Sequence, residues 1–290
     1  MQRADSSQET YFAQRQAVLA TMHRKEITIA PLLKQELGID VMVPSNFDSD
    51  RFGTFTRDVE RPANQVETAR QKALAAMELT GDTIGIASEG TFAPHPAMPF
   101  LPCDREIVVL IDRQHNLELV GEAISTETNF SHAAIASLEQ ALAFAKKANF
   151  PSHGLVVMPS ADSKKTHTII KGITTEAQLI ETISQMLETF GSAHLETDMR
   201  AMHNPTRMNV IQQATQDLIR KAKQQCPNCR LPGFAVVEQR SGLPCDLCGH
   251  PTNQILASIY ACKKCGFEQP ILFPNQTQFA DPMFCEFCNP

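Results

Sequence analysis

Apolar and polar positions follow two rhythms along the first 225 residues of the chain. Short continuous apolar runs bounded by turn residues predict buried strands. These runs occupy residues 17–21, 39–43, 83–87, 107–111 and 117–123. Between the runs, apolar residues recur at helical spacing, most clearly just before Gly38, which stands at the position of a C-terminal cap. The alternation of strands with helices predicts an α/β domain with a mixed sheet flanked by helices.

The middle of the chain extends this pattern. A helix is expected to begin near Pro62, a favourable residue for a first turn, and to end before Gly81. Further helices and strands then alternate. The expected helices cover residues 131–147, 175–189 and 208–223, and the expected strands cover residues 155–157, 167–170 and 194–196.

The end of the chain is rich in cysteine. Eight of the nine cysteines form four C-x-x-C pairs, at Cys226 and Cys229, Cys245 and Cys248, Cys262 and Cys265, and Cys285 and Cys288. Two such pairs can surround one Zn²⁺ with a tetrahedron of thiolates. The 15 and 19 residues that separate the first pair from the second and the third from the fourth fit the spacing of zinc ribbons. Sequential pairing is therefore the first expectation, and an interleaved cross-brace is the alternative.

A site with four cysteine ligands has no open position for water or substrate, so the two zinc ions are expected to be structural. From Cys226 onward the chain carries four basic and five acidic side chains, and bound thiolates add further negative charge. This charge disfavours nucleic acid as a partner. A scaffold or a contact with a protein partner is the expected role of this double zinc-ribbon-like module.

Length and charge set broader limits. A chain of 290 residues with 42% hydrophobic residues accommodates an α/β domain over residues 1–224 and a smaller module over residues 225–290. The net charge of −6 also works against non-specific binding to nucleic acid. Because no apolar stretch approaches the roughly 18 residues of a membrane span, and the start lacks a signal-peptide pattern, we expect a cytoplasmic protein without a membrane segment.

Polar side chains follow the expected strands, where ligands of α/β folds gather. His23 and Lys25 lie in a loop before a helix, where backbone N–H groups and a lysine can bind phosphate, although a solvated loop has the same pattern. Glu89 follows a buried strand, and together with Glu67 it could hold Mg²⁺. Glu67 could instead form a surface ion pair with Arg70, one turn further along its helix.

A second polar group immediately precedes the last expected helix. Asn204 could cap this helix, whereas Arg200 and Arg207 could clamp a phosphate or a carboxylate. A single site would combine Lys25, Glu89, Asp198, Arg200 and Arg207. A structural network of ion pairs is the alternative. Cys103 has no identifiable base nearby in the sequence, so a role as a nucleophile is not expected.

Residues 66–91 resemble the inosine/xanthosine triphosphatase branch of the inosine triphosphate pyrophosphatase superfamily. That branch has an Ala-rich helix with acidic and basic residues, followed by a strand that ends in a Gly-x-Glu-Gly-Gly type turn. This chain has a threonine in place of the last of those glycines. The resemblance implies that Lys25 and Lys72 contact phosphates, and that Glu67 and Glu89 bind the metal that assists pyrophosphate release.

The whole chain also resembles an uncharacterised bacterial family known only as a domain of unknown function. The likeness rests on the cysteine tail and on short motifs. These motifs lie at residues 53–55, 88–90, 128–130, 171–172, 198–200 and 204–207. The resemblance implies an architecture and no particular reaction.

Three hypotheses of function follow. The first is a Mg²⁺-dependent phosphohydrolase, similar to a nucleoside triphosphate pyrophosphatase, with Lys25, Glu67, Glu89 and Asp198 in one cleft. The second is a protein that binds a phosphorylated small molecule without chemistry. Its ligand-binding residues would be His23, Lys72, Arg200, Asn204 and Arg207. The third is an interaction module with an α/β scaffold and no deep polar pocket. The first hypothesis is slightly favoured.

Overall fold

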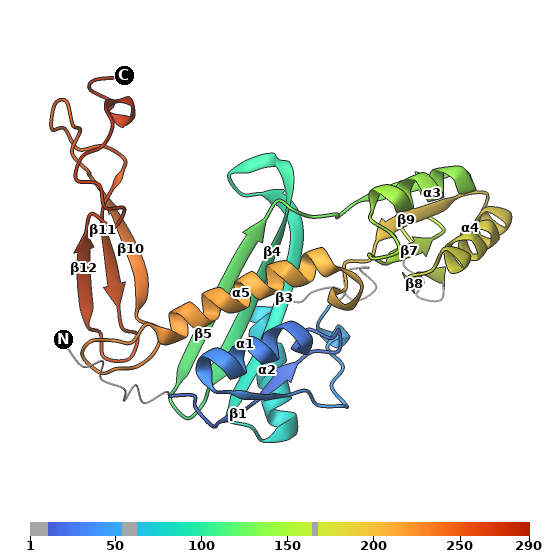
Figure 1. Ribbon diagram of the computed structural model, residues 1–290, viewed down its shortest axis with the longest axis horizontal. Helices are drawn as coiled ribbons and strands as arrows, with labels where there is room; N and C mark the ends of the chain where they lie inside the picture. Colours follow the sequence, from blue (N-terminus) through green and yellow to red (C-terminus); the bar gives the residue numbers. More distant parts are fainter. Residues whose placement is uncertain (1–10, 54–62, 164–167) are drawn as a thin grey trace. The chain divides into compact units, whose positions relative to one another are not determined.

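The computed structural model describes residues 11–53, 63–163 and 168–290. The chain divides into two compact units, Met1–Ile219 and Arg220–Pro290 (Figure 1). The predicted α/β architecture with sheets flanked by helices and a cysteine-rich C-terminal module is confirmed. Among the helices within the described ranges, none combines the length and apolar character that a membrane crossing requires.

The larger unit contains a five-stranded mixed sheet in the order β2-β1-β3-β4-β5 (Figure 1). β1 (Gln16–Ala20) lies parallel to β2 (Asp40–Met42) and to β3 (Ile84–His95). β4 (Met98–Asp112) and β5 (Leu117–Ser125) continue the sheet as antiparallel strands. Most of the predicted strands are thus present, but β3 and β4 extend well beyond the apolar runs that predicted them.

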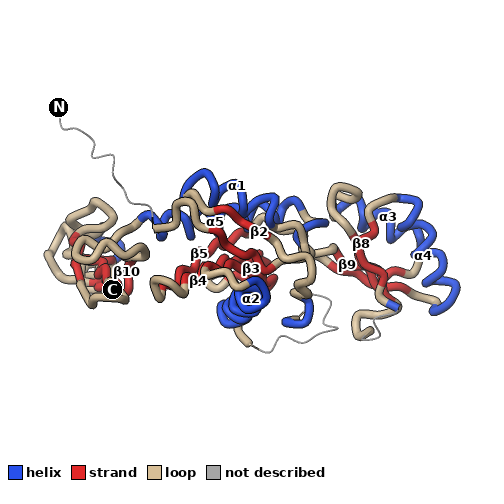
Figure 2. The backbone as a smooth tube through the Cα atoms, turned by 90° about the horizontal axis from the view of Figure 1, so that it is seen from below, coloured by secondary structure: helices blue, strands red, loops and turns tan. Residues whose placement is uncertain are grey.

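Two helices connect the parallel strands and cover opposite faces of the sheet (Figure 2). α1 (Glu26–Leu37) and α2 (Gln65–Thr80) each end at a glycine in the left-handed conformation, as the sequence predicted. The predicted helix start near Pro62 lies outside the described residues, and the side chain of Asn64 caps α2. The alanine-rich face of α2 packs with β1, β3 and β4 in one apolar core.

α5 (Pro205–Lys223) begins on the same face of this sheet as α1 (Figure 2). Its backbone comes close to β5 at Gly121, where a Cβ atom would lie 2.2 Å from the carbonyl oxygen of Ala214. Only glycine permits this approach of helix to strand. The close packing holds the middle of α5 against β5, and Arg207 lies in the first turn of the same helix.

A second, antiparallel sheet in the larger unit has the order β6-β9-β7-β8. Its strands are β6 (His132–Ile135), β7 (Leu155–Met158), β8 (Ile170–Ile173) and β9 (Ala193–Thr197). α3 (Leu138–Lys147) and α4 (Glu176–Phe190) pack against it around a separate apolar core. The expected strand over residues 167–170 begins outside the described residues, and β8 begins at its last residue, Ile170.

The prediction of a single helix over residues 131–147 is wrong at its start. The first part of this segment forms β6, which pairs with β9, and Ser137 caps α3 by accepting a hydrogen bond from the N–H of Gln140. Four residues are too few for periodicity to separate helix from strand. The pairing with a strand some 60 residues later decides the structure, as tertiary contacts often override local propensity.

The smaller unit is built on a three-stranded antiparallel sheet. β11 (Ile255–Ala261) lies between β10 (Ala235–Ser241) and β12 (Glu268–Leu272). The side chains of β10 and β12 are largely exposed, and those at the centre of β11 are buried. So little apolar burial indicates that the cysteine clusters carry much of the stability of this unit.

Candidate functional site

The eight cysteines of the smaller unit form two clusters of four thiols. The first cluster contains Cys226, Cys229, Cys262 and Cys265, and the second contains Cys245, Cys248, Cys285 and Cys288. The Sγ atoms of Cys229 and Cys262 are 3.6 Å apart, and those of Cys245 and Cys288 are 3.9 Å apart. A tetrahedral ion with Zn–S bonds of about 2.3 Å separates its sulfurs by about 3.8 Å. The spacing therefore fits one metal ion in each cluster.

The sequential pairing that was first expected is wrong, and the interleaved alternative is correct. The topology of the sheet explains the difference. The first and third C-x-x-C pairs flank the start of β10 and the turn between β11 and β12, which lie at one end of an antiparallel sheet. The second and fourth pairs follow the ends of β10 and β12 at the other end. Each cluster thus joins segments that the three strands bring together.

A cavity of about 310 Å³ lies in the larger unit, beyond the carboxyl end of β1. β1 pairs with β3 only as far as Ala87, so the next part of β3 is left with an open edge. Because α1 and α2 leave on opposite faces, this is the topological switch point where α/β sheets bind ligands. The polar lining comprises His23, Lys25, Asp50, Lys72, Glu89, Lys171, Glu196, Asp198, Arg200 and Arg207.

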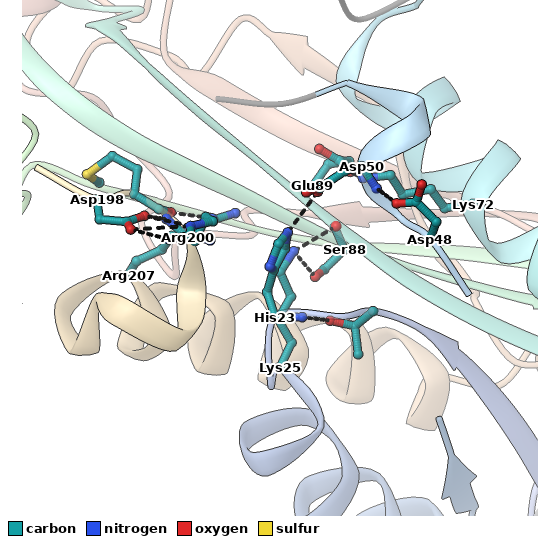
Figure 3. Close-up of polar contacts among 12 residues, drawn as sticks. His23, Lys25, Asp48, Asp50, Lys72, Ser88, Glu89, Asp198, Arg200 and Arg207 are labelled. Atoms are coloured by element: carbon teal, nitrogen blue, oxygen red, sulfur yellow. Dashed lines mark hydrogen bonds and ion pairs between the residues drawn. The ribbon is translucent and has the colours of Figure 1, made fainter. Parts of the chain in front are cut away.

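Lys25 immediately precedes α1 and is buried. Its Nζ donates hydrogen bonds to the carbonyl oxygen of Ser88 at 2.9 Å and to the Oγ of Ser88 at 2.8 Å (Figure 3). Burial, and secondly the nearby guanidinium of Arg207, lower the pKa of Lys25 from 10.5 to about 7. Lys25 therefore changes its charge near neutral pH.

Glu89 lies inside β3, which continues beyond the strand that the sequence predicted over residues 83–87. Its buried carboxylate forms an ion pair with Lys72 of α2. Glu67, its predicted partner in holding Mg²⁺, does not share this position. It forms an ion pair with Arg70, whose guanidinium also contacts Glu118 of β5. The surface ion pair that was the alternative for Glu67 is thus present.

A deeply buried ion pair joins α5 to β4. The Nε of Arg207 donates to the Oε1 of Glu106 at 2.6 Å, and both side chains are at most 1% exposed. Gly90 of β3 faces this pair. A Cβ atom there would lie 2.0 Å from the Oε1 of Glu106 and 2.7 Å from a terminal nitrogen of Arg207. The absence of a side chain at position 90 is therefore what makes room for the pair.

A second buried carboxyl group, that of Asp104, lies on the same face of β4 as Glu106. Within the described part of the chain, one oxygen of each carboxyl group is buried without a hydrogen-bond partner. Burial, and secondly the negative charge of Glu106, raise the pKa of Asp104 to about 8. At neutral pH the carboxyl group of Asp104 therefore holds a proton in the folded state.

This proton makes stability depend on pH. The folded-state pKa of Asp104 is above its unfolded value of 3.8, so the folded protein binds more protons between these values and stability falls as pH rises through this window. We expect Asp104→Asn to stabilise the protein relative to wild type by on the order of 2 kcal/mol more at pH 7 than at pH 5. Urea unfolding at both pH values tests this, and an equal difference at the two values would contradict it.

Asp198 and Arg200 follow β9 and form the opposite wall of the cavity (Figure 3). Arg200 donates from Nη2 to Asp198 at 2.6 Å, and the backbone N–H of Gly172 donates to the same carboxylate at 3.1 Å. Asn204 is fully buried, and its Oδ1 accepts a hydrogen bond from the N–H of Arg207. Asn204 thus lies at the start of α5, in the capping role that was the alternative to ligand binding.

His23 also points toward the cavity and is paired with an acid. Its Nε2 lies 3.0 Å from the Oδ1 of Asp50 (Figure 3). This hydrogen bond is the largest cause that lowers the pKa of Asp50. The Oδ1 of Asp48 accepts a hydrogen bond from the N–H of Asp50, which shapes the turn that carries the acid.

The cavity thus brings together most of the predicted site residues, including Lys25, Lys72, Glu89, Asp198 and Arg200. It also contains residues that the sequence did not assign to a site. Lys171, Glu196, Phe92 and Phe130 line it, and the two phenylalanine rings stack at 5.6 Å. Alternation along β9 could have directed attention to Glu196. Lys171 belongs to the motif at residues 171–172, but its place in the cavity depends on the pairing of β8 with β7, which the sequence does not show.

Comparison with known protein families gives a match over most of the chain. A search of curated proteins gives no match to this chain. A family model described as a domain of unknown function, DUF6671, matches residues 72–290. This match includes β3, the wall formed by Asp198 and Arg200, and both cysteine clusters, and it covers more than half of the chain. The chain therefore belongs to the DUF6671 family.

Proposed function

We propose that the cavity of the larger unit binds a small phosphate-bearing molecule. The observation that carries this proposal is the position of the cavity at the switch point of the sheet, in front of α1. The amino-terminal end of a helix favours anions through its free N–H groups and its dipole. Lys171 and Arg200 add positive charge from two different segments. The volume is suited to a small metabolite.

Binding can be measured by calorimetric titration of the full chain with inorganic phosphate, pyrophosphate and nucleoside mono- and triphosphates. Lys171→Gln is expected to weaken binding of the tightest ligand by about tenfold, because a charge-assisted hydrogen bond contributes roughly 1.5–3 kcal/mol. Lys147→Gln is the matched control, since Lys147 is an exposed lysine of the adjacent α3. Equal affinities of wild type and Lys171→Gln, or no binding of any of these anions, would refute the proposal.

Hydrolysis of such a ligand with Mg²⁺ is a second candidate function. Its support is the carboxylate of Glu89, which lines the cavity beside Lys72 and Asp50. A divalent cation at Glu89 would compete with the ammonium group of Lys72, which the ion pair now holds there. Release of phosphate or pyrophosphate from inosine and xanthosine triphosphates by wild type, with its loss in Glu89→Gln, would support hydrolysis. Binding without turnover would leave the first function alone.

The metal of both cysteine clusters is proposed to be zinc. Four thiolates at tetrahedral spacing are the ligand set that zinc takes in structural sites. Each cluster consists of four cysteines among the described residues, and such a site is closed to water and substrate, so the role of the ions is to hold the unit together. Elemental analysis of the purified protein is expected to give two zinc ions per chain. Iron in place of zinc would overturn the assignment.

A further inference from the structure

Two buried lysines line the cavity, and their surroundings differ. Lys72 forms an ion pair with the carboxylate of Glu89. Lys25 is equally buried, yet within the described residues its hydrogen bonds run only to the two uncharged oxygens of Ser88. A buried ammonium group without a carboxylate in contact is costly, and the usual outcome is loss of its proton. Lys25 therefore lines the cavity as a primary amine whose lone pair is available at neutral pH.

The electrostatic surroundings of Lys25 support the uncharged form. The guanidinium of Arg207 and the ammonium of Lys72 both disfavour a further positive charge, although Glu106 and Glu89 oppose them. Burial outweighs these opposing charges, and the pKa of about 7 leaves a large neutral fraction at pH 7. Desolvated lysines beside other cationic groups are the lysines that act as nucleophiles toward carbonyl carbon.

We propose that Lys25 forms an imine with the carbonyl carbon of a phosphate-bearing aldehyde or ketone. This inference rests on the proposed phosphate-binding function, and it names the class of ligand. Lys171 and Arg200 line the same cavity as Lys25, so their positive charges can hold the phosphate there. Phe130 is partly exposed, and its stack on Phe92 offers an apolar surface for the body of the ligand.

The chemistry requires no further reagent. The lone pair of Nζ attacks the carbonyl carbon and forms a C–N bond, which gives a carbinolamine after one N–H proton moves to oxygen. The second N–H proton then leaves with the hydroxyl group as water, and a C=N double bond remains. Ser88 accepts hydrogen bonds from the amine and holds it in place, so Ser88 is a positioning residue.

Pyridoxal 5′-phosphate is a suitable probe, because it carries an aldehyde, a phosphate and a flat ring. The full chain is incubated with it at pH 7, reduced with borohydride to fix any imine as a secondary amine, and digested for mass spectrometry. Labelling of Lys25 is expected to exceed that of the exposed Lys34 by at least about tenfold, since an ordinary lysine is almost fully protonated at this pH. Pyridoxal, which lacks the phosphate, is expected to label Lys25 several-fold less.

Two comparisons separate the outcomes. Lys25→Arg removes the primary amine and keeps a cationic side chain, so its adduct at position 25 is expected to be absent and labelling of Lys34 unchanged. Labelling of Lys25 no stronger than of Lys34, in a protein that still binds pyrophosphate by calorimetry, overturns the imine and leaves phosphate binding intact. Equal labelling of Lys25 by pyridoxal and its phosphate overturns the phosphate-bearing ligand. If Lys25 is not labelled and pyrophosphate does not bind, both the imine and the phosphate-binding function are refuted.

Discussion

Removal of the metal ions is expected to unfold the smaller unit and to leave the larger unit folded. The strands β10 and β12 are mostly exposed, so apolar burial contributes little to hold the three strands together. Metal binding to comparable small sites supplies roughly 10–16 kcal/mol of folding free energy. Hydrogen exchange of the full chain, with and without a strong chelator, measures this in both units. The buried centre of β11 should lose its protection, and β4 should keep it. Unchanged protection of β11 after complete metal loss would contradict the expectation.

The same sites allow a test of the interleaved pairing. Cys229→Ser and Cys262→Ser belong to one cluster, so each should remove one metal ion and the double variant should still keep the other. Cys229→Ser combined with Cys245→Ser should lose both ions, because those residues lie in different clusters. Sequential pairing predicts the reverse for the two double variants. Metal content per chain, measured on protein that still has a folded larger unit, decides between them.

The helices that cover the central sheet could be predicted from sequence because their signals are local. Gly38 and Gly81 mark the ends of α1 and α2, and both adopt the left-handed conformation that favours glycine. The strand β6 could not be predicted, since it is stabilised by pairing with β9 and not by its own pattern. The second sheet as a separate layer was missed for the same reason. The order of strands depends on contacts between distant segments, which periodicity does not report.

In the candidate site, too, residues with local sequence signals could be predicted, and contacts between distant segments could not. Lys25 and Arg200 could be found because each follows a strand that its own sequence predicts. Glu106 could not be found as a partner of Arg207, because it lies 101 residues from its partner and nothing in the sequence links the two positions. The position of Glu67 could not be predicted either. Helical periodicity gives the spacing of residues along a helix, but it does not show which face of the helix meets the edge of the sheet. The neighbours Arg70 and Glu118 hold Glu67 in an ion-pair network.

Loss of the Arg207 side chain is expected to destabilise the larger unit by about 3–5 kcal/mol, the usual cost of leaving a buried charge without its partner. In Arg207→Met the carboxylate of Glu106 would remain buried beside Asp104, whose carboxyl group already has a raised pKa. Urea unfolding followed by fluorescence or circular dichroism measures the loss. The double variant Arg207→Met with Glu106→Leu should regain much of the lost stability, because it replaces both buried charges by apolar side chains that need no partner.

Gly90→Ala tests the same ion pair without changing any charge. The new Cβ atom would lie where the Oε1 of Glu106 now lies, so the pair must separate or β3 must shift away from α5. Because Gly90 does not have a positive φ, any loss of stability in Gly90→Ala would come from the steric clash of the new Cβ atom and not from the backbone conformation. We therefore expect Gly90→Ala to change the free energy of unfolding by a different amount in a Glu106→Leu, Arg207→Met background than in wild type. A cost that is the same in both backgrounds would show that the ion pair is not what position 90 accommodates.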